Sequence, residues 1–103
     1  MSDATKAKAQ EKLAAFTVKI GYPDKWKDYT TLKIDPAKSY WENIVEANAW
    51  YTSDNISKLG KPVDKDEWHM SPQTVNAYYN PTTNEICFPA AILQPPFYNP
   101  DAV

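Results

Sequence analysis

Residues 75–89, VNAYYNPTTNEICFP, decide the fold of this part of the chain. The stretch begins with β-branched and aromatic residues, and residues 85–88 return to that pattern with an isoleucine and a phenylalanine. Between them, residues 80–84 form a turn cluster in which Pro81 fixes φ and the asparagines favour a turn. We therefore predict an antiparallel β-hairpin that ends at Pro89, because proline has no amide hydrogen to donate.

A first helix is predicted over residues 4–16, which are rich in alanine, lysine, glutamate and leucine. Ser2 is available as its N-cap. Gly21 is the first strong stop signal, and we expect residues 17–20 to be irregular. The helix is interpreted as a packing element rather than a membrane-surface one.

A second, longer helix is predicted to end at Gly60. Asp35 followed by Pro36 offers one start, and Ser39 with Glu42 three residues later offers another as a capping box. Because the predicted helix is apolar on much of its surface, we expect it to be buried between other elements.

The predicted fold class is α+β, with two main helices and an antiparallel β-hairpin. Residues 32–34 alternate apolar and charged side chains and allow a third short strand. We expect a single unit made of a helical part over about 3–60, a connector over 61–73, and a hairpin with an apolar tail over 74–98.

Composition excludes several kinds of partner for this chain. Its net charge is −2, which gives no electrostatic reason to expect nucleic acid. It contains no apolar run of the roughly 20 residues that a membrane-spanning helix needs. The chain has four tryptophans in 103 residues, so some should be exposed unless another part of a longer protein covers them.

The reactive side chains are few. Cys87 is the only cysteine and lies in a predicted strand, which favours a buried inert thiol over a nucleophile. His69 is the only histidine, and nothing in the sequence argues for a Cys–His pair. The acidic residues within 64–67 favour a solvated turn, and Glu85 is expected to be exposed. We assign no catalytic residue and no metal ligand to this chain.

The hairpin and its tail resemble the neprilysin and endothelin-converting-enzyme family of zinc metallopeptidases. The resemblance is carried by the following runs, in chain order: IGYPD at 20–24, KPVD at 61–64, NAYY at 76–79, NEI and FPA within 84–90, and ILQPPF at 92–97. It covers nearly the whole chain, but only a small part of a family catalytic region, just upstream of the zinc-binding helix.

The resemblance implies that the intact parent is a zinc metalloendopeptidase that hydrolyses peptide bonds in short peptides outside the cytoplasm, as a periplasmic, secreted or membrane-anchored protein. The family binds zinc through an H-E-x-x-H helix and a downstream glutamate, and that motif does not occur in these 103 residues. We therefore expect zinc in the intact parent, and neither zinc binding nor peptidase activity in this chain alone. A stand-alone peptide-binding or structural module without catalysis is the alternative.

The resemblance also implies site residues. Asn76 and Ala77 match the pair that holds the substrate backbone in the family, while Ile92 and Phe97 match the lining of the pocket for the residue after the scissile bond. The implied partners are a peptide substrate and the remainder of the parent catalytic domain. From the residues alone, two alternatives stay open: Asn76 could bond within the hairpin, and the two apolar residues could be plain core.

Overall fold

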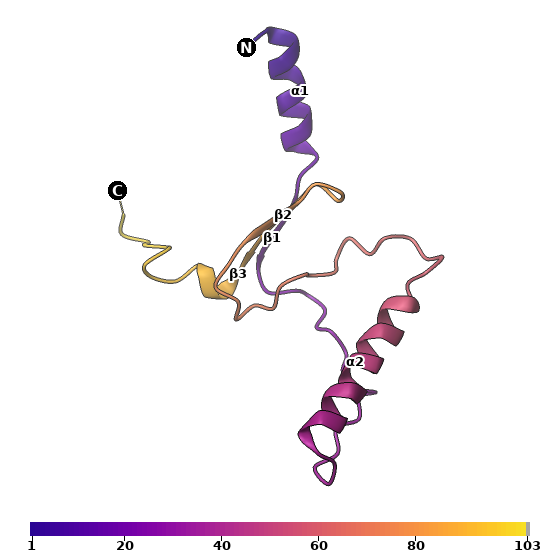
Figure 1. Ribbon diagram of the computed structural model, residues 1–103. Helices are drawn as coiled ribbons and strands as arrows, with labels where there is room; N and C mark the ends of the chain where they lie inside the picture. Colours follow the sequence, from indigo (N-terminus) through magenta and orange to yellow (C-terminus); the bar gives the residue numbers. More distant parts are fainter. Residues whose placement is uncertain (103) are drawn as a thin grey trace. The chain divides into compact units, whose positions relative to one another are not determined.

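The computed structural model describes residues 1–102. Its elements are α1 (Asp3–Ala14), β1 (Thr17–Gly21), α2 (Tyr40–Ile56), β2 (Tyr78–Asn80), β3 (Glu85–Pro89) and the 3₁₀ turn η1 (Ala90–Ile92) (Figure 1). The predicted α+β class is confirmed. By its contacts the chain divides into two compact units, Lys25–Asp64 and the remaining residues on either side of it.

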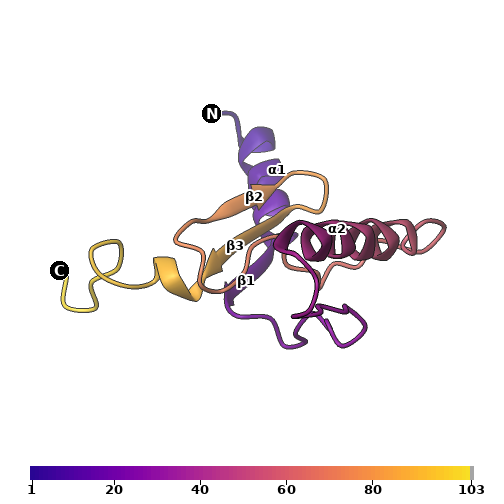
Figure 2. The same ribbon diagram turned by 60° about the horizontal axis from the view of Figure 1, so that its bottom comes forward.

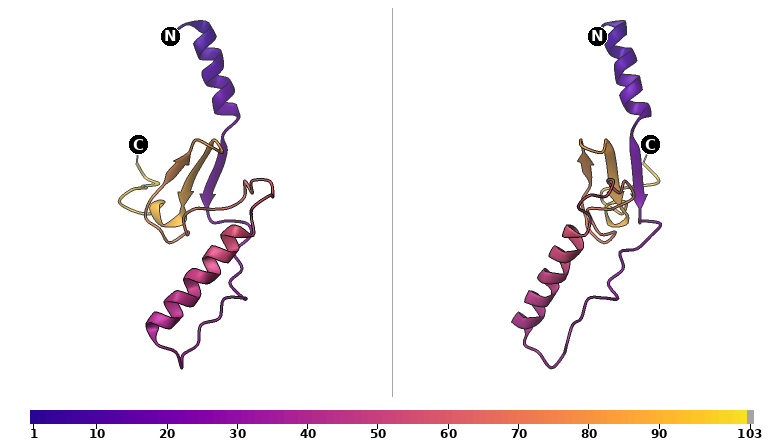
Figure 3. Two further views of the ribbon diagram at one scale, coloured as in Figure 1. Left: turned by 45° about the vertical axis from the view of Figure 1, so that its right-hand side comes forward. Right: turned by 90° about the vertical axis from the view of Figure 1, so that its right-hand side faces the viewer.

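The strands form one sheet in the order β1-β3-β2 (Figure 3). The predicted hairpin is confirmed, since β2 and β3 pair antiparallel. The third strand, however, is β1 and not residues 32–34, and it pairs with β3 in parallel from Thr17 opposite Glu85 to Gly21 opposite Pro89. The expectation that residues 17–20 are irregular was wrong because the free edge of β3 supplies hydrogen-bond partners that local sequence does not reveal.

The register gives this sheet one polar and one apolar face. Lys19, Cys87 and Tyr78 are direct neighbours across the three strands and therefore share a face. This polar face is the covered one, because Lys19 is only 7 % exposed and Cys87 is fully buried. On the opposite face Val18 and Ile20 are 59 % and 62 % exposed. The distribution is the reverse of a sheet that packs its apolar face inside the same chain.

Helix α2 begins where its capping box predicts. The Ser39 hydroxyl accepts a hydrogen bond from the Glu42 N–H at 3.3 Å, and the Glu42 carboxylate accepts one from the Ser39 N–H at 2.8 Å. The expectation that the helix is buried was wrong, since no described residue of α2 is buried and Tyr40 is 82 % exposed. Within its unit the helix contacts only an irregular segment, where Trp50 donates to Thr31 at 2.8 Å.

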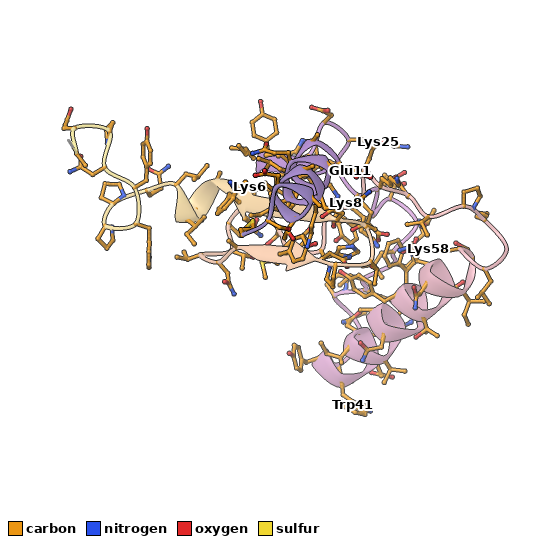
Figure 4. All side chains as sticks on the ribbon, turned by 90° about the horizontal axis from the view of Figure 1, so that it is seen from above. Lys6, Lys8, Glu11, Lys25, Trp41 and Lys58 are labelled. Atoms are coloured by element: carbon orange, nitrogen blue, oxygen red, sulfur yellow. The ribbon has the colours of Figure 1, made fainter. Side chains whose placement is uncertain are left out.

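The predicted exposure of tryptophan is confirmed. Trp41 is 71 % exposed at the start of α2 (Figure 4), and Trp26 is 60 % exposed. Among the described residues, no helix combines the length and apolarity required to cross a membrane.

Candidate functional site

The candidate site lies at the start of β2, an edge strand of the described sheet. Strand β2 pairs with β3 along one side, as Figure 2 shows. Asn76 and Ala77 are the two residues just before it, and the Asn76 side chain is exposed. An edge strand presents backbone groups to which an extended peptide can add as a further strand.

In the side-chain amide of Asn76, the oxygen is bonded within the chain. Oδ1 accepts a hydrogen bond from the Ala77 N–H at 2.8 Å, and the backbone N–H of Asn76 donates to the Thr74 carbonyl at 2.9 Å. For Nδ2 the structure records no partner among residues 1–102. The side chain therefore bonds its neighbouring backbone rather than bridging the hairpin, and its two N–H donors remain available to a carbonyl from outside.

The structure brings the segment before Asn76 next to η1. The Pro72 carbonyl accepts a hydrogen bond from the Ala91 N–H at 2.9 Å, which places that turn beside the backbone that carries Ile92. Ile92 is half-buried, whereas Phe97 is 67 % exposed and lies further along the tail. Of the two predicted pocket residues, Ile92 thus lies on a segment directly bonded to the turn before Asn76.

A buried ion pair lies on the covered face of the sheet. Lys19 Nζ is 2.7 Å from Glu85 Oε2, and Glu85 is only 1 % exposed. The expectation that Glu85 is exposed was therefore wrong. Alternation along the central strand β3 puts this carboxylate on the covered face, and the neighbouring strand β1 supplies its countercharge.

Tyr78 joins this ion pair to the connector that precedes the hairpin. Its hydroxyl donates to Glu85 Oε1 at 3.3 Å and accepts from the His69 N–H at 3.3 Å. Lys19 Nζ also donates to the Glu67 carbonyl at 2.7 Å. We call Lys19, Glu85 and Tyr78 the polar cluster. It hydrogen-bonds the connector backbone to the sheet at two points.

Burial changes the ionisation of the groups around the polar cluster. It raises the pKa of Tyr78 to about 12, so the tyrosine keeps its donor at higher pH than an exposed tyrosine would. It also raises the pKa of Cys87, which is fully buried. The expected buried position of this thiol is confirmed. The imidazole Nε2 of His69 lies 3.8 Å from Glu85 Oε1 at the exposed rim of the cluster.

Sequence reasoning missed the polar cluster because no local pattern identifies it. Lys19 and Glu85 are 66 positions apart and come together only through the parallel pairing of β1 with β3. The available signal was a charged residue at the centre of an otherwise apolar run, TVKIG, because a buried charge needs a partner.

Comparisons with known proteins identify the family. Residues 76–103 match the model of Peptidase family M13. Neprilysin-3 of Drosophila melanogaster is 43 % identical over 102 residues, which cover 92 % of this chain and 13 % of that protein. The chain belongs to peptidase family M13.

Further relatives of this M13 chain include a neutral endopeptidase from Lactobacillus helveticus, 45 % identical over 96 % of this chain and 16 % of that protein. The crystal structure of the Mycobacterium tuberculosis zinc metalloprotease Zmp1 in complex with inhibitor matches with a TM-score of 0.89 and 53 % identity, over 100 % of this chain and 16 % of that chain. This chain thus spans between 13 % and 16 % of the length of these relatives.

The described residues of the M13 chain do not fit a zinc site. Within residues 1–102, no three His, Cys, Asp or Glu side chains are grouped so that they could hold a metal ion. A catalytic zinc needs about three protein ligands and one open position. The His69 imidazole lies 3.8 Å from the Glu85 carboxylate, and Lys19 already forms an ion pair with that carboxylate.

Proposed function

We propose that this chain is the substrate-aligning part of a neprilysin-like zinc metalloendopeptidase that hydrolyses peptide bonds in short peptides. The observation that carries the proposal is the Asn76 amide, exposed beside an edge strand with its Nδ2 donors unused by the described residues. A peptide that adds along β2 brings carbonyl groups to this edge, where such a donor can bind them.

Each predicted site residue has a physical role in this proposal. Asn76 donates from Nδ2 to a substrate carbonyl while its Oδ1 stays bonded to the Ala77 N–H. Ala77 allows a second backbone to approach because its side chain is a single methyl group. Ile92 and Phe97 contribute apolar walls to the pocket for the residue after the scissile bond, and the exposure of Phe97 leaves it free to contact substrate.

The remaining parts of the active site come from the rest of the proposed parent. Zinc and its ligands belong to that remainder. The relatives are long enough to contain such a remainder, since this chain covers only 13 % and 16 % of their length. The exposed apolar side chains of Val18, Ile20 and Trp41 suit burial against it. The parent acts outside the cytoplasm, as a periplasmic, secreted or membrane-anchored enzyme. The 103 residues alone do not cleave peptides.

The test of the proposal is Asn76→Ala in a full-length M13 peptidase that carries this sequence. Loss of one neutral hydrogen bond predicts a fall in kcat/KM of roughly two- to tenfold, or more if the bond tightens in the transition state. Asn76→Asp keeps the acceptor and removes the donor, so it should be at least as harmful. The control is Asn55→Ala, which removes an exposed asparagine from α2.

Two results would contradict the proposal. If both Asn76 variants keep the kcat/KM and the melting temperature of the unsubstituted enzyme, Asn76 does not bind substrate. Tight one-to-one zinc binding by the isolated chain, lost in His69→Ala, would show that the chain carries a metal site of its own. Isothermal titration with zinc at neutral pH measures this second result directly.

A further inference from the structure

We propose that Glu85 and Tyr78 are positioning residues for substrate, because the polar cluster closes and fixes the loop that carries Asn76 and Ala77. This inference rests on the proposed function, in which those two residues bind the peptide backbone. Glu85 and Tyr78 act on substrate only through that loop, from the covered face of the sheet.

The loop is closed by a hydrogen bond between its ends. The His69 N–H donates to the Tyr78 hydroxyl at 3.3 Å, which joins a residue within the connector to the first residue of β2. The side-chain bond thus encloses residues 70–77. A closed loop has fewer conformations than an open one, so less entropy is lost when it binds in one geometry.

Glu85 fixes the direction of the closing hydroxyl. Its Oε1 accepts a hydrogen bond from the Tyr78 hydroxyl at 3.3 Å. This leaves a lone pair of the hydroxyl oxygen for the His69 N–H. Its Oε2 is held by Lys19 at 2.7 Å, so the carboxylate itself is oriented. Tyrosine is protonated near neutral pH, and burial, which raises the pKa of Tyr78 to about 12, extends this donor role to higher pH.

Two further contacts hold the chain, one just before this loop and one within it. Lys19 donates to the Glu67 carbonyl at 2.7 Å, just before the closing bond, and the Pro72 carbonyl binds the Ala91 N–H at 2.9 Å within the loop. Asn76 itself is exposed, and within residues 1–102 its recorded bonds go to the Ala77 N–H and the Thr74 carbonyl. The position of its amide relative to β2 therefore depends on how the loop is closed beneath it.

The experiment is a double-mutant cycle in a full-length M13 peptidase that carries this sequence. Tyr78→Phe removes only the hydroxyl, and it is measured in the Asn76 and the Asn76→Ala backgrounds. We expect Tyr78→Phe to raise KM by roughly two- to tenfold in the first background and by much less in the second, since a loop without the amide has nothing left to position. Tyr79→Phe is the control: it lies on the same strand and loses a hydroxyl bond of 3.0 Å to Asn84, outside the cluster.

The outcomes separate this inference from the proposed function. If Asn76→Ala itself leaves kcat/KM unchanged, the proposed function fails. If Asn76→Ala is harmful but Tyr78→Phe is harmless, or equally harmful in both backgrounds, the positioning role is wrong and the cluster is structural only. Glu85→Gln keeps the size of the side chain and removes its charge, and it should show the same background dependence. Because it also leaves the buried Lys19 without its anion, its melting temperature is measured beside that of Tyr78→Phe, so that a loss of folding is told apart from a loss of positioning.

Discussion

Removing the cation of the polar cluster should destabilise the chain strongly. Lys19→Met keeps most of the side-chain volume but leaves the Glu85 carboxylate, which is 1 % exposed, without its ion-pair partner. Breaking a buried ion pair in this way costs about 3–5 kcal/mol. The remaining Tyr78 hydroxyl bond favours the lower end of that range, while loss of the Lys19 bond to the Glu67 carbonyl adds about 0.5–1.5 kcal/mol.

The predicted loss is therefore about 4 kcal/mol, which for a chain of this size lowers the melting temperature by roughly 15–30 °C. Circular dichroism during thermal and urea unfolding measures it. The matched control is Lys8→Met, which breaks an exposed ion pair of 2.6 Å with Glu11 on α1 (Figure 4) and should leave the midpoint nearly unchanged.

A second variant decides whether the orphaned charge is the cause. Adding Glu85→Gln to Lys19→Met removes the unpaired carboxylate and should recover at least about 1 kcal/mol of the loss. Equal stability of Lys19→Met and the unsubstituted chain would refute the buried pair. A double variant that is less stable than Lys19→Met would show that the loss comes from packing and not from charge.

Three other predictions follow from ionisation near the sheet and at a helix cap. Because burial raises the pKa of Cys87, iodoacetamide should label it slowly at pH 8 and much faster in denaturing urea; equal rates would contradict its burial. Because the pKa of Tyr78 is raised to about 12, its protonated form stabilises the fold fully below about pH 10, and this contribution should be lost as the pH rises toward 12; absorbance and circular dichroism titrations must then change together. The Ser39 hydroxyl and N–H lower the pKa of Glu42, so the cap of α2 is stabilised above the ordinary glutamate pKa and weakens as the pH falls through the lowered value; carboxyl NMR titration should show that Ser39→Ala returns the pKa of Glu42 toward normal.

Local chemistry made part of the fold predictable. The start of α2 follows from Ser39 and Glu42, because a capping box involves only neighbouring residues. The hairpin follows from its turn, where Asn80 Oδ1 accepts the Thr82 N–H at 3.0 Å and Asn84 adopts a positive φ of 49°. In both places the hydrogen bonds join residues no more than three positions apart, so the local sequence predicts them.

Pairing between distant segments was not predictable from local patterns. The strand β1 exists because Thr17 and its successors align with β3, 68 positions away at the first pair, and no short-range signal specifies a parallel partner. The burial of Glu85 follows from the same register. The candidate site residues Asn76 and Ala77 were found through a family resemblance. The polar cluster could be found only once the pairing of β1 with β3 was known.

The two faces of the sheet explain why a site of this kind suits an M13 peptidase. The polar face is complete within the described chain, since Lys19, Glu85 and Tyr78 satisfy one another and the connector. The apolar face, with Val18 and Ile20 more than half exposed, is not. Under the proposed function, burial of that face against the remaining peptidase would join this sheet to the part that carries zinc. The polar cluster would then set the geometry of the peptide-binding edge from one side of β2 and β3, while the apolar face sets the position of that edge relative to the catalytic groups from the other.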